Sequence, residues 1–347
     1  MTRRKTRRTL RLENLEDRSL LTAGGPSPDA QHMLELINLA RTNPSGAAQW
    51  VEQHVDANVK ATLDAYHVDL QSELNQIAAS PVRAPLAWNS QLSQSATAHS
   101  QDQAKTGVQS HLSSTGLSTE ERMDQVSYTN RVADGENVYA YSQSVDHAME
   151  AFLLDWGVSS KGHRHNLLQN DVPEADQYRD VGIGIVASNK PGFGPFVITQ
   201  DFGTQSGAKA QLLGVAYNDP NHSHQFAPGQ GRGDVTIQVT NKATGQRQSV
   251  QTWDSGGYQI ALDRGDYTET ALVGNVVVKS RDVTIGADNV KVDFDLSDPW
   301  TGTVPKPTPP VQVPAKASVL ADNLMASIND VSWLTSWSQW TAGKAGH

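Results

Sequence analysis

The chain has 347 residues, no cysteine, 37% hydrophobic residues and a formal net charge of −9. This length suggests two domains plus tails, since domains average about 150 residues, and no run approaches the ~18 apolar residues of a membrane-spanning helix. The lack of thiols excludes disulfide scaffolds, thiolate metal sites and cysteine nucleophiles, but not export. Because residues 1–11 are strongly basic, the rest of the chain is acidic. An acidic body argues against nucleic-acid binding.

The N-terminus resembles an export leader without a complete secretory signal. Residues 3–8 are basic, and small residues follow at 22–25, but three acids and Arg18 interrupt the apolar stretch between them. The segment resembles the short Leu-Glu-x-Leu-Glu-x-Arg-x-Leu-Leu leader of exported proteins in some bacteria. We therefore interpret residues 1–28 as export leader and linker, and expect a secreted or cell-surface protein. A disordered basic tail and an amphipathic helix on a membrane surface are the alternatives.

Helices dominate the next part of the chain. Apolar residues at helical spacing predict a helix from Gln31 that ends before Asn43-Pro44, and Ser45 is a possible cap of a second helix. Residues 56–82 form a polar insertion that we expect to be helical. A further helix is expected to begin at Asn89, with four residues on one face: Leu92, Ala96, His99 and Gln103.

Strands follow this helical part. We expect them at 136–141, 181–187 and 196–202, with a helix at 145–156 between the first two. Helices that alternate with strands in this mixed order predict an α+β layer structure.

Residues 208–297 have a different pattern. Four short β-type runs separated by Gly, Asn and Asp turns predict a small all-β sandwich domain. Within it, residues 219–230 resemble the start of a calcium loop, but His224 and Gln230 replace the required glycine and bidentate acid, so we do not expect calcium. Residues 298–317 form a proline-rich linker. The tail at 318–347 is amphipathic and Trp-rich, which favours a packing helix over a ligand platform.

The residue types that carry chemistry gather in the middle of the chain, in short motifs. These are Ser110-His111, Gly135-Glu136-Asn137, Asp155-Trp156, Gly162-His163-Arg164-His165-Asn166, Val181-Gly182-Ile183-Gly184 and Thr199-Gln200-Asp201-Phe202-Gly203. Taken singly, each is ordinary. In this order, and with Leu36–Arg41 and Leu86–Asn89 before them, residues 29–205 resemble the CAP superfamily (SCP/PR-1-like proteins), especially its cysteine-free bacterial members. The resemblance implies a three-layer α-β-α sandwich, here followed by the β-sandwich domain.

Members of this superfamily carry a cleft with two histidines and two acids. Matched residue by residue, the resemblance assigns His111, Glu136 and His163 to three of these positions. The fourth falls on Asp155, because Phe152 occupies the place of a helical tryptophan that precedes the acid by three residues; Glu150 is a weaker substitute. His99 is expected to face the core, and His165 to point away from His163.

Three roles are open for this cleft. Two imidazoles and a carboxylate can hold a divalent cation such as Zn²⁺, with His111 and His163 as ligands, or can move protons without metal. The cleft would then bind a small molecule, a lipid, a peptide or another cell-envelope component. As an enzyme, the protein would be a hydrolase that uses His111 or His163 with Glu136, although no obvious nucleophile adjoins the histidines in sequence. The third possibility is a hydrogen-bonded network that only ties loops to the sheet. The sequence does not indicate an oligomeric state.

Overall fold

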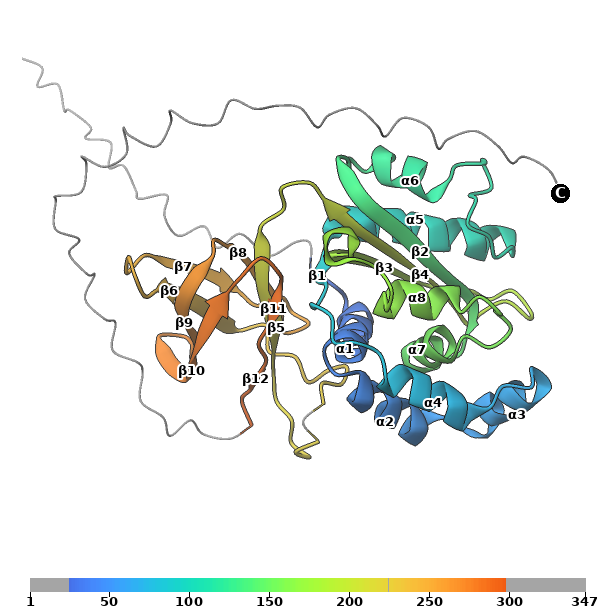
Figure 1. Ribbon diagram of the computed structural model, residues 1–347, viewed down its shortest axis with the longest axis horizontal. Coiled ribbons are helices and arrows are strands. Elements are labelled where there is room, and N and C mark those ends of the chain that lie inside the picture. The colour runs from blue at the N-terminus through green and yellow to red at the C-terminus, as the bar shows by residue number, and fades with distance from the viewer. Residues whose placement is uncertain (1–24, 224, 298–347) are drawn as a thin grey trace, which may run out of the picture. The chain divides into compact units, whose positions relative to one another are not determined.

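The computed structural model describes residues 25–223 and 225–297. Its first part is a three-layer structure around a four-stranded sheet with the strand order β1-β3-β4-β2 (Figure 1). The strands are β1 (Ala87–Trp88), β2 (Arg131–Ser142), β3 (Asp180–Ala187) and β4 (Phe196–Gln205). Strand β4 is antiparallel to both β2 and β3, and the short β1 is parallel to β3. The three predicted strands are confirmed, each with somewhat wider bounds.

Helices cover both faces of this sheet. One face carries α1 (Pro28–Thr42), α7 (Val145–Leu154) and α8 (Gly162–Leu168), and the other carries α5 (Ser90–Thr106) with α6 (Thr119–Gln125) beside it. Three more helices follow α1 in the chain: α2 (Pro44–His54), α3 (Ala57–Ala65) and α4 (Leu70–Ala78). Helix α2 packs against α1, and α4 packs against α2 and α7. The α+β prediction is thus confirmed in the form of an α-β-α sandwich, and the insertion at 56–82 is helical as expected.

Local sequence explains where these helices begin. The side chain of Asn89 accepts hydrogen bonds from the backbone N–H groups of Gln91 and Leu92, which is the predicted cap of α5. The predicted cap at Ser45 is wrong, because Asn43 caps α2 through the N–H of Gly46 and Pro44 occupies the first turn. Proline is favoured there because its missing N–H is not needed in the first turn.

The second part of the described chain is built from strands only. One sheet has the order β10-β9-β6-β7, and the other joins β11, β5, β12 and β8. Their bounds are β5 (Ala210–Tyr217), β6 (Val235–Asn241), β7 (Arg247–Gln251), β8 (Gly257–Leu262), β9 (Gly265–Val273), β10 (Val276–Ile285), β11 (Val290–Lys291) and β12 (Phe294–Asp295). Side chains from both sheets share one core, among them Ile237, Ile260 and Phe294. This is the β-rich region that the sequence predicts after the sandwich.

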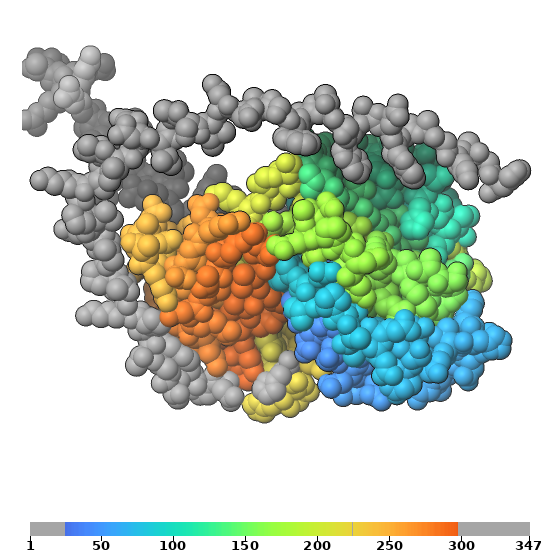
Figure 2. Space-filling model, viewed as in Figure 1, coloured from blue at the N-terminus to red at the C-terminus, as the bar shows by residue number. Residues whose placement is uncertain are grey.

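Specific contacts join the two parts, which belong to one compact unit. The amide of Asn289 donates to the carbonyl oxygens of Pro85 (3.0 Å) and Arg179 (2.8 Å), and Lys291 pairs with Glu35 at 2.7 Å. On the face that Figure 2 shows, the β-rich part in orange adjoins the helical part in blue and green. The division into separate domains at 29–205 and 208–297 stays a prediction.

Of the expected leader and linker at 1–28, the structure describes only residues 25–28. Within them, Ser27 caps α1. The proline-rich linker at 298–317 and the Trp-rich tail at 318–347 lie outside the described residues. Within the described part, none of the helices combines the length and the apolar character needed to cross a membrane.

Candidate functional site

Two histidine–carboxylate pairs form the candidate site. In the first, Nδ1 of His111 lies 2.7 Å from Oε1 of Glu136. The His111 side chain is 61% exposed whereas that of Glu136 is 2% exposed. His111 comes from the loop after α5, and Glu136 comes from β2. The buried carboxylate of Glu136 thus orients a solvent-exposed imidazole, and Nε2 of that imidazole is available to another partner.

The carboxylate of Glu136 is held by more than His111. Arg122 of α6 donates to Oε2, and the hydroxyl of Thr119 donates to Oε1 at 3.1 Å. Burial alone would raise the pKa of Glu136, but the hydrogen bond from His111 and the charge of Arg122 keep this pKa below its usual value. Glu136 is therefore ionised at neutral pH, and it raises the pKa of His111 through their hydrogen bond.

A third acid lies beneath this pair, and sequence reasoning did not give it a role. Asp201 is the cross-strand neighbour of Glu136 in the register of β2 with β4, and it is fully buried. Burial, followed by the charge of Glu136, raises the pKa of Asp201 well above its usual range. Burial therefore favours the protonated form of Asp201 at the base of the site. The sequence signal was its place in the motif Thr199-Gln200-Asp201-Phe202-Gly203, to which no chemical role was assigned from the sequence.

The second pair joins His163 to Asp155. Helix α7 ends at Asp155, which adopts a left-handed conformation with φ of 53°. Its carboxylate accepts a hydrogen bond from the backbone N–H of His163 at 3.0 Å, and its other oxygen lies 2.7 Å from Nδ1 of the same histidine. Asp155 thus fixes both the start of α8 and the imidazole orientation. The structure places Asp155, and not Glu150, beside His163.

Amide side chains connect the two pairs. Asn166 donates to the carbonyl oxygen of Glu136 at 3.1 Å, and Asn137 donates to the carbonyl oxygen of His163 at 3.2 Å. These bonds tie α8 to β2, so the residues after Gly135 and after Gly162 are neighbours in space. The four residues selected from the sequence therefore form two pairs on adjacent elements.

The remaining candidates belong to neither pair, although Nε2 of His99 lies 3.9 Å from Oε2 of Glu136. His99 is 1% exposed and its Nε2 lies 2.7 Å from the carbonyl oxygen of Ser110, while burial lowers its pKa. His165 pairs with the exposed Asp171 at 3.2 Å. Glu150 is 3% exposed, and burial raises its pKa to about 7. His99 thus faces the core, and the other two do not reach the pairs.

The fit of a metal to this arrangement is limited. Across residues 25–223 and 225–297, no group of three or more His, Asp or Glu side chains is arranged to hold a metal ion. His111 and His163 each have Nδ1 directed to a carboxylate, so each can offer only Nε2. A zinc site with three protein ligands, as catalytic zinc uses, does not fit these residues.

The fold is therefore an α-β-α sandwich, and its candidate site consists of two histidine–carboxylate pairs on β2 and the segments beside it. This fold and these site residues are those expected from the sequence motifs. The model of the CAP family, described as the cysteine-rich secretory protein family, matches residues 34–202. This part of the chain belongs to the CAP family, as the sequence motifs predict.

Twelve chains among the solved structures match this chain, and two of them are described here. An extracellular protein containing an SCP domain from Bacillus anthracis is 22% identical, with a TM-score of 0.29, over 44% of this chain and 44% of that chain. An outer surface protein from Borrelia burgdorferi is 15% identical, with a TM-score of 0.28, over 44% of this chain and 97% of that chain. The match thus spans less than half the length of the Bacillus protein. The search of curated proteins found no match.

The first pair predicts a measurable pH dependence. Because Glu136 raises the pKa of His111 above 6.5, we expect Glu136→Gln to lower that pKa in a histidine NMR titration. His165, which lies outside the pair, is the internal control. A raised folded-state pKa contributes stability that is complete below the unfolded value and is lost as pH rises through the folded value. The stability advantage of wild type over Glu136→Gln should therefore shrink as the pH rises above 6.5. An unchanged His111 titration would contradict this pairing.

Proposed function

We propose that the histidine–carboxylate pairs at His111, Glu136 and His163 bind a ligand, which is a small molecule, a lipid, a peptide or a cell-envelope component. The observation that supports this most directly is the pair of imidazoles whose Nδ1 atoms are fixed by buried carboxylates. Each ring can present Nε2 to a ligand, and the buried charges behind the rings are already compensated. Such preorganisation lowers the cost of binding.

A divalent cation such as zinc is the second way to use these rings. It would be bound by the Nε2 atoms of His111 and His163, with the ligand or water as its other partners. We also propose that the protein is exported to the cell exterior or surface. The basic leader and the membership of residues 34–202 in a secretory protein family support export.

Zinc calorimetry on the full chain separates the two modes of binding. If a cation mediates ligand binding, zinc should bind to the wild-type protein and not to the His111→Ala/His163→Ala double variant. His165→Ala is the matched control, because it removes an exposed histidine from the same helix as His163. Binding that persists in the double variant would place the cation elsewhere. If the wild-type protein binds no zinc, ligands would have to contact the imidazoles directly.

A hydrolase is the alternative function. His111 or His163 would be the general base, oriented by Glu136 or Asp155, since a base must be held within hydrogen-bond reach of the proton it removes. In that case His163→Ala should abolish hydrolysis of a p-nitrophenyl ester while His165→Ala retains it. Full activity in His163→Ala would remove the catalytic hypothesis for this residue.

A further inference from the structure

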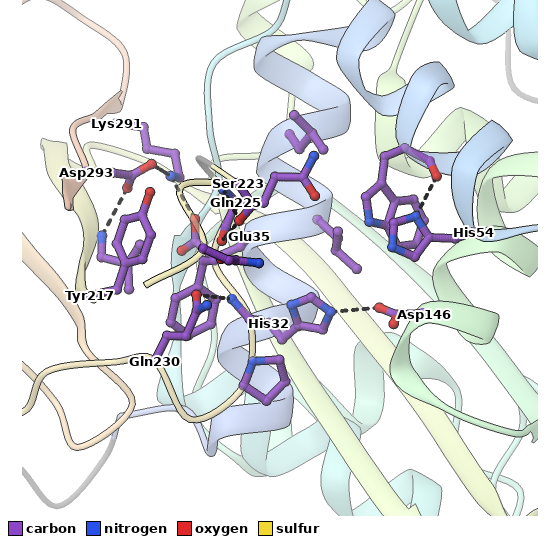
Figure 3. A pocket seen from close by; sticks show the side chains of 18 of the residues that line it. His32, Glu35, His54, Asp146, Tyr217, Ser223, Gln225, Gln230, Lys291 and Asp293 are labelled. Atoms are coloured by element: carbon purple, nitrogen blue, oxygen red, sulfur yellow. Dashed lines mark hydrogen bonds and ion pairs between the residues drawn. The ribbon is translucent and has the colours of Figure 1, made fainter. Parts of the chain in front are cut away.

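A cavity of about 570 Å³ lies away from the histidine pairs, where the helical part meets the β-rich part (Figure 3). Its walls come from α1, α2, the start of α7, β5, the segment between β5 and β6, and the chain from β11 to Asp293. This volume falls within the roughly 300–1,000 Å³ of small-molecule sites, which often lie between domains. Neither His111, Glu136 nor His163 lines it. The cavity is therefore a second candidate site, independent of the function proposed above.

The charged groups of the wall are already paired with one another. Lys291 lies 2.7 Å from Glu35 and also contacts Asp293, while Nε2 of His32 lies 2.7 Å from Asp146 (Figure 3). Burial alone would lower the pKa of Lys291, but the charges of Asp293 and Glu35 raise it above its usual value. Lys291 is thus a cation that its own neighbours neutralise. A charged ligand would have to break one of these pairs, and removing one partner of a buried ion pair is costly.

Uncharged hydrogen-bonding groups remain for a ligand. The side-chain oxygen of Gln230 accepts from the N–H of Ala227 at 2.9 Å, so its NH₂ group is left for another partner. The Nδ1 atom of His54 forms a hydrogen bond with the carbonyl oxygen of Trp50 at 2.7 Å. The Nε2 atom of His54 is then available to a ligand. Further amide groups come from the exposed segment after β5, at Asn221 and Gln225, whereas the hydroxyl of Ser223 between them already donates to Asp219 at 3.0 Å.

Apolar surface lies between these polar groups. The ring of Phe226 is half-buried and packs edge-on to Tyr217, with ring centroids 6.0 Å apart. Leu36 and Leu39 of α1 line the cavity from the helical part. Aromatic and aliphatic faces surrounded by planar amides, imidazoles and hydroxyls suit a molecule with apolar ring faces and a periphery of hydroxyl groups.

We propose that this cavity binds a neutral saccharide. Each sugar hydroxyl both donates and accepts, which matches a wall that offers amide donors, imidazole nitrogens and hydroxyl groups. The C–H face of a sugar ring would lie against Phe226. Since the wall contains residues of both α1 and the β-rich part, the second part of the chain completes the site instead of being a passive spacer.

The test is calorimetry and saturation-transfer NMR on the full chain with chitotriose, cellotriose and maltotriose. We expect at least one trisaccharide to bind, and Phe226→Ala to raise its dissociation constant about tenfold, which corresponds to about 1.4 kcal/mol. Tyr66→Ala is the matched control, because it removes an aromatic ring that is 56% exposed and does not line the cavity. A second variant, Leu39→Trp, fills the cavity from the α1 side and should also weaken binding. Circular dichroism spectra of all variants show whether each one folds.

Three results would overturn the proposal. The first is no binding of any of the three sugars to the folded wild-type chain. The second is sugar binding that both Phe226→Ala and Leu39→Trp leave unchanged. The third is binding of trilysine, with loss in Phe226→Ala, in place of the sugars, which would assign the cavity to a cationic peptide. The double variant His111→Ala/His163→Ala should bind the sugar normally, so failure of this proposal is distinguishable from failure of the first.

Discussion

Replacement of Arg122 by alanine is expected to destabilise the folded protein by about 3–5 kcal/mol, the usual cost of leaving a buried charge without its partner. Arg122 is 5% exposed and contacts the buried carboxylate of Glu136. It also donates to the carbonyl oxygens of His111 at 2.7 Å and Leu117 at 3.1 Å. The substitution therefore removes the buried cation from Glu136, which keeps its hydrogen bonds with His111 and Thr119, and takes this donor from two carbonyl groups. Chemical denaturation measures the loss.

A second variant separates the electrostatic effect on Glu136 from the effect of removing the packing contacts of the Arg122 side chain. Adding Glu136→Gln to Arg122→Ala removes the uncompensated anion, so the double variant should be more stable than the Arg122→Ala single variant. The control is Arg232→Ala, which breaks the more exposed pair with Asp234 and should cost no more than about 1 kcal/mol. An Arg122→Ala loss as small as that of the control would show that Glu136 does not depend on this cation.

The second large effect is expected at Gly182 of β3, where α5 lies directly on the sheet. A Cβ atom on Gly182 would lie 2.0 Å from the backbone nitrogen of Ser93 and 2.1 Å from the carbonyl carbon of Leu92. Both are backbone atoms of α5, so the helix itself would have to move. We expect Gly182→Ala to destabilise the fold by about 3 kcal/mol, at the upper end of the usual cost of overpacking.

The matched control for this substitution is Gly286→Ala in the β-rich part. A Cβ atom on Gly286 meets nothing within 4 Å, so this change should be neutral or slightly stabilising through the unfolded state. Gly182→Ala should also broaden or shift the NMR signals of His111, because Gly182 is the cross-strand neighbour of Asp201 beneath the site. Equal stability of the two variants would contradict the close contact between α5 and β3.

The sequence predicted local elements well where one physical feature dominates. Asn89 before an apolar helical face predicted α5, because a side-chain oxygen must satisfy the first N–H groups of a helix. At Asn43-Pro44-Ser45 two residues were able to cap the same helix, and only the backbone conformation selected Asn43. Ordered motifs also indicated the CAP family, and the family model matches residues 34–202.

Tertiary structure decided what surrounds the histidines. Nothing local distinguishes Asp201 from any other acid in a strand, and only the register of β2 with β4 places it beneath Glu136. Arg122 likewise acquires its partner through packing, since Glu136 lies 14 positions further along the chain. The cavity at Phe226 depends on contacts between segments nearly 200 residues apart in sequence. The sequence alone determined the start of α5, the positions of the three central strands, the motif residues and the lack of cysteine. Strand register and the contact between the two parts decided which charges are compensated and where a cavity remains, because burial and pairing depend on distances that chain order does not set.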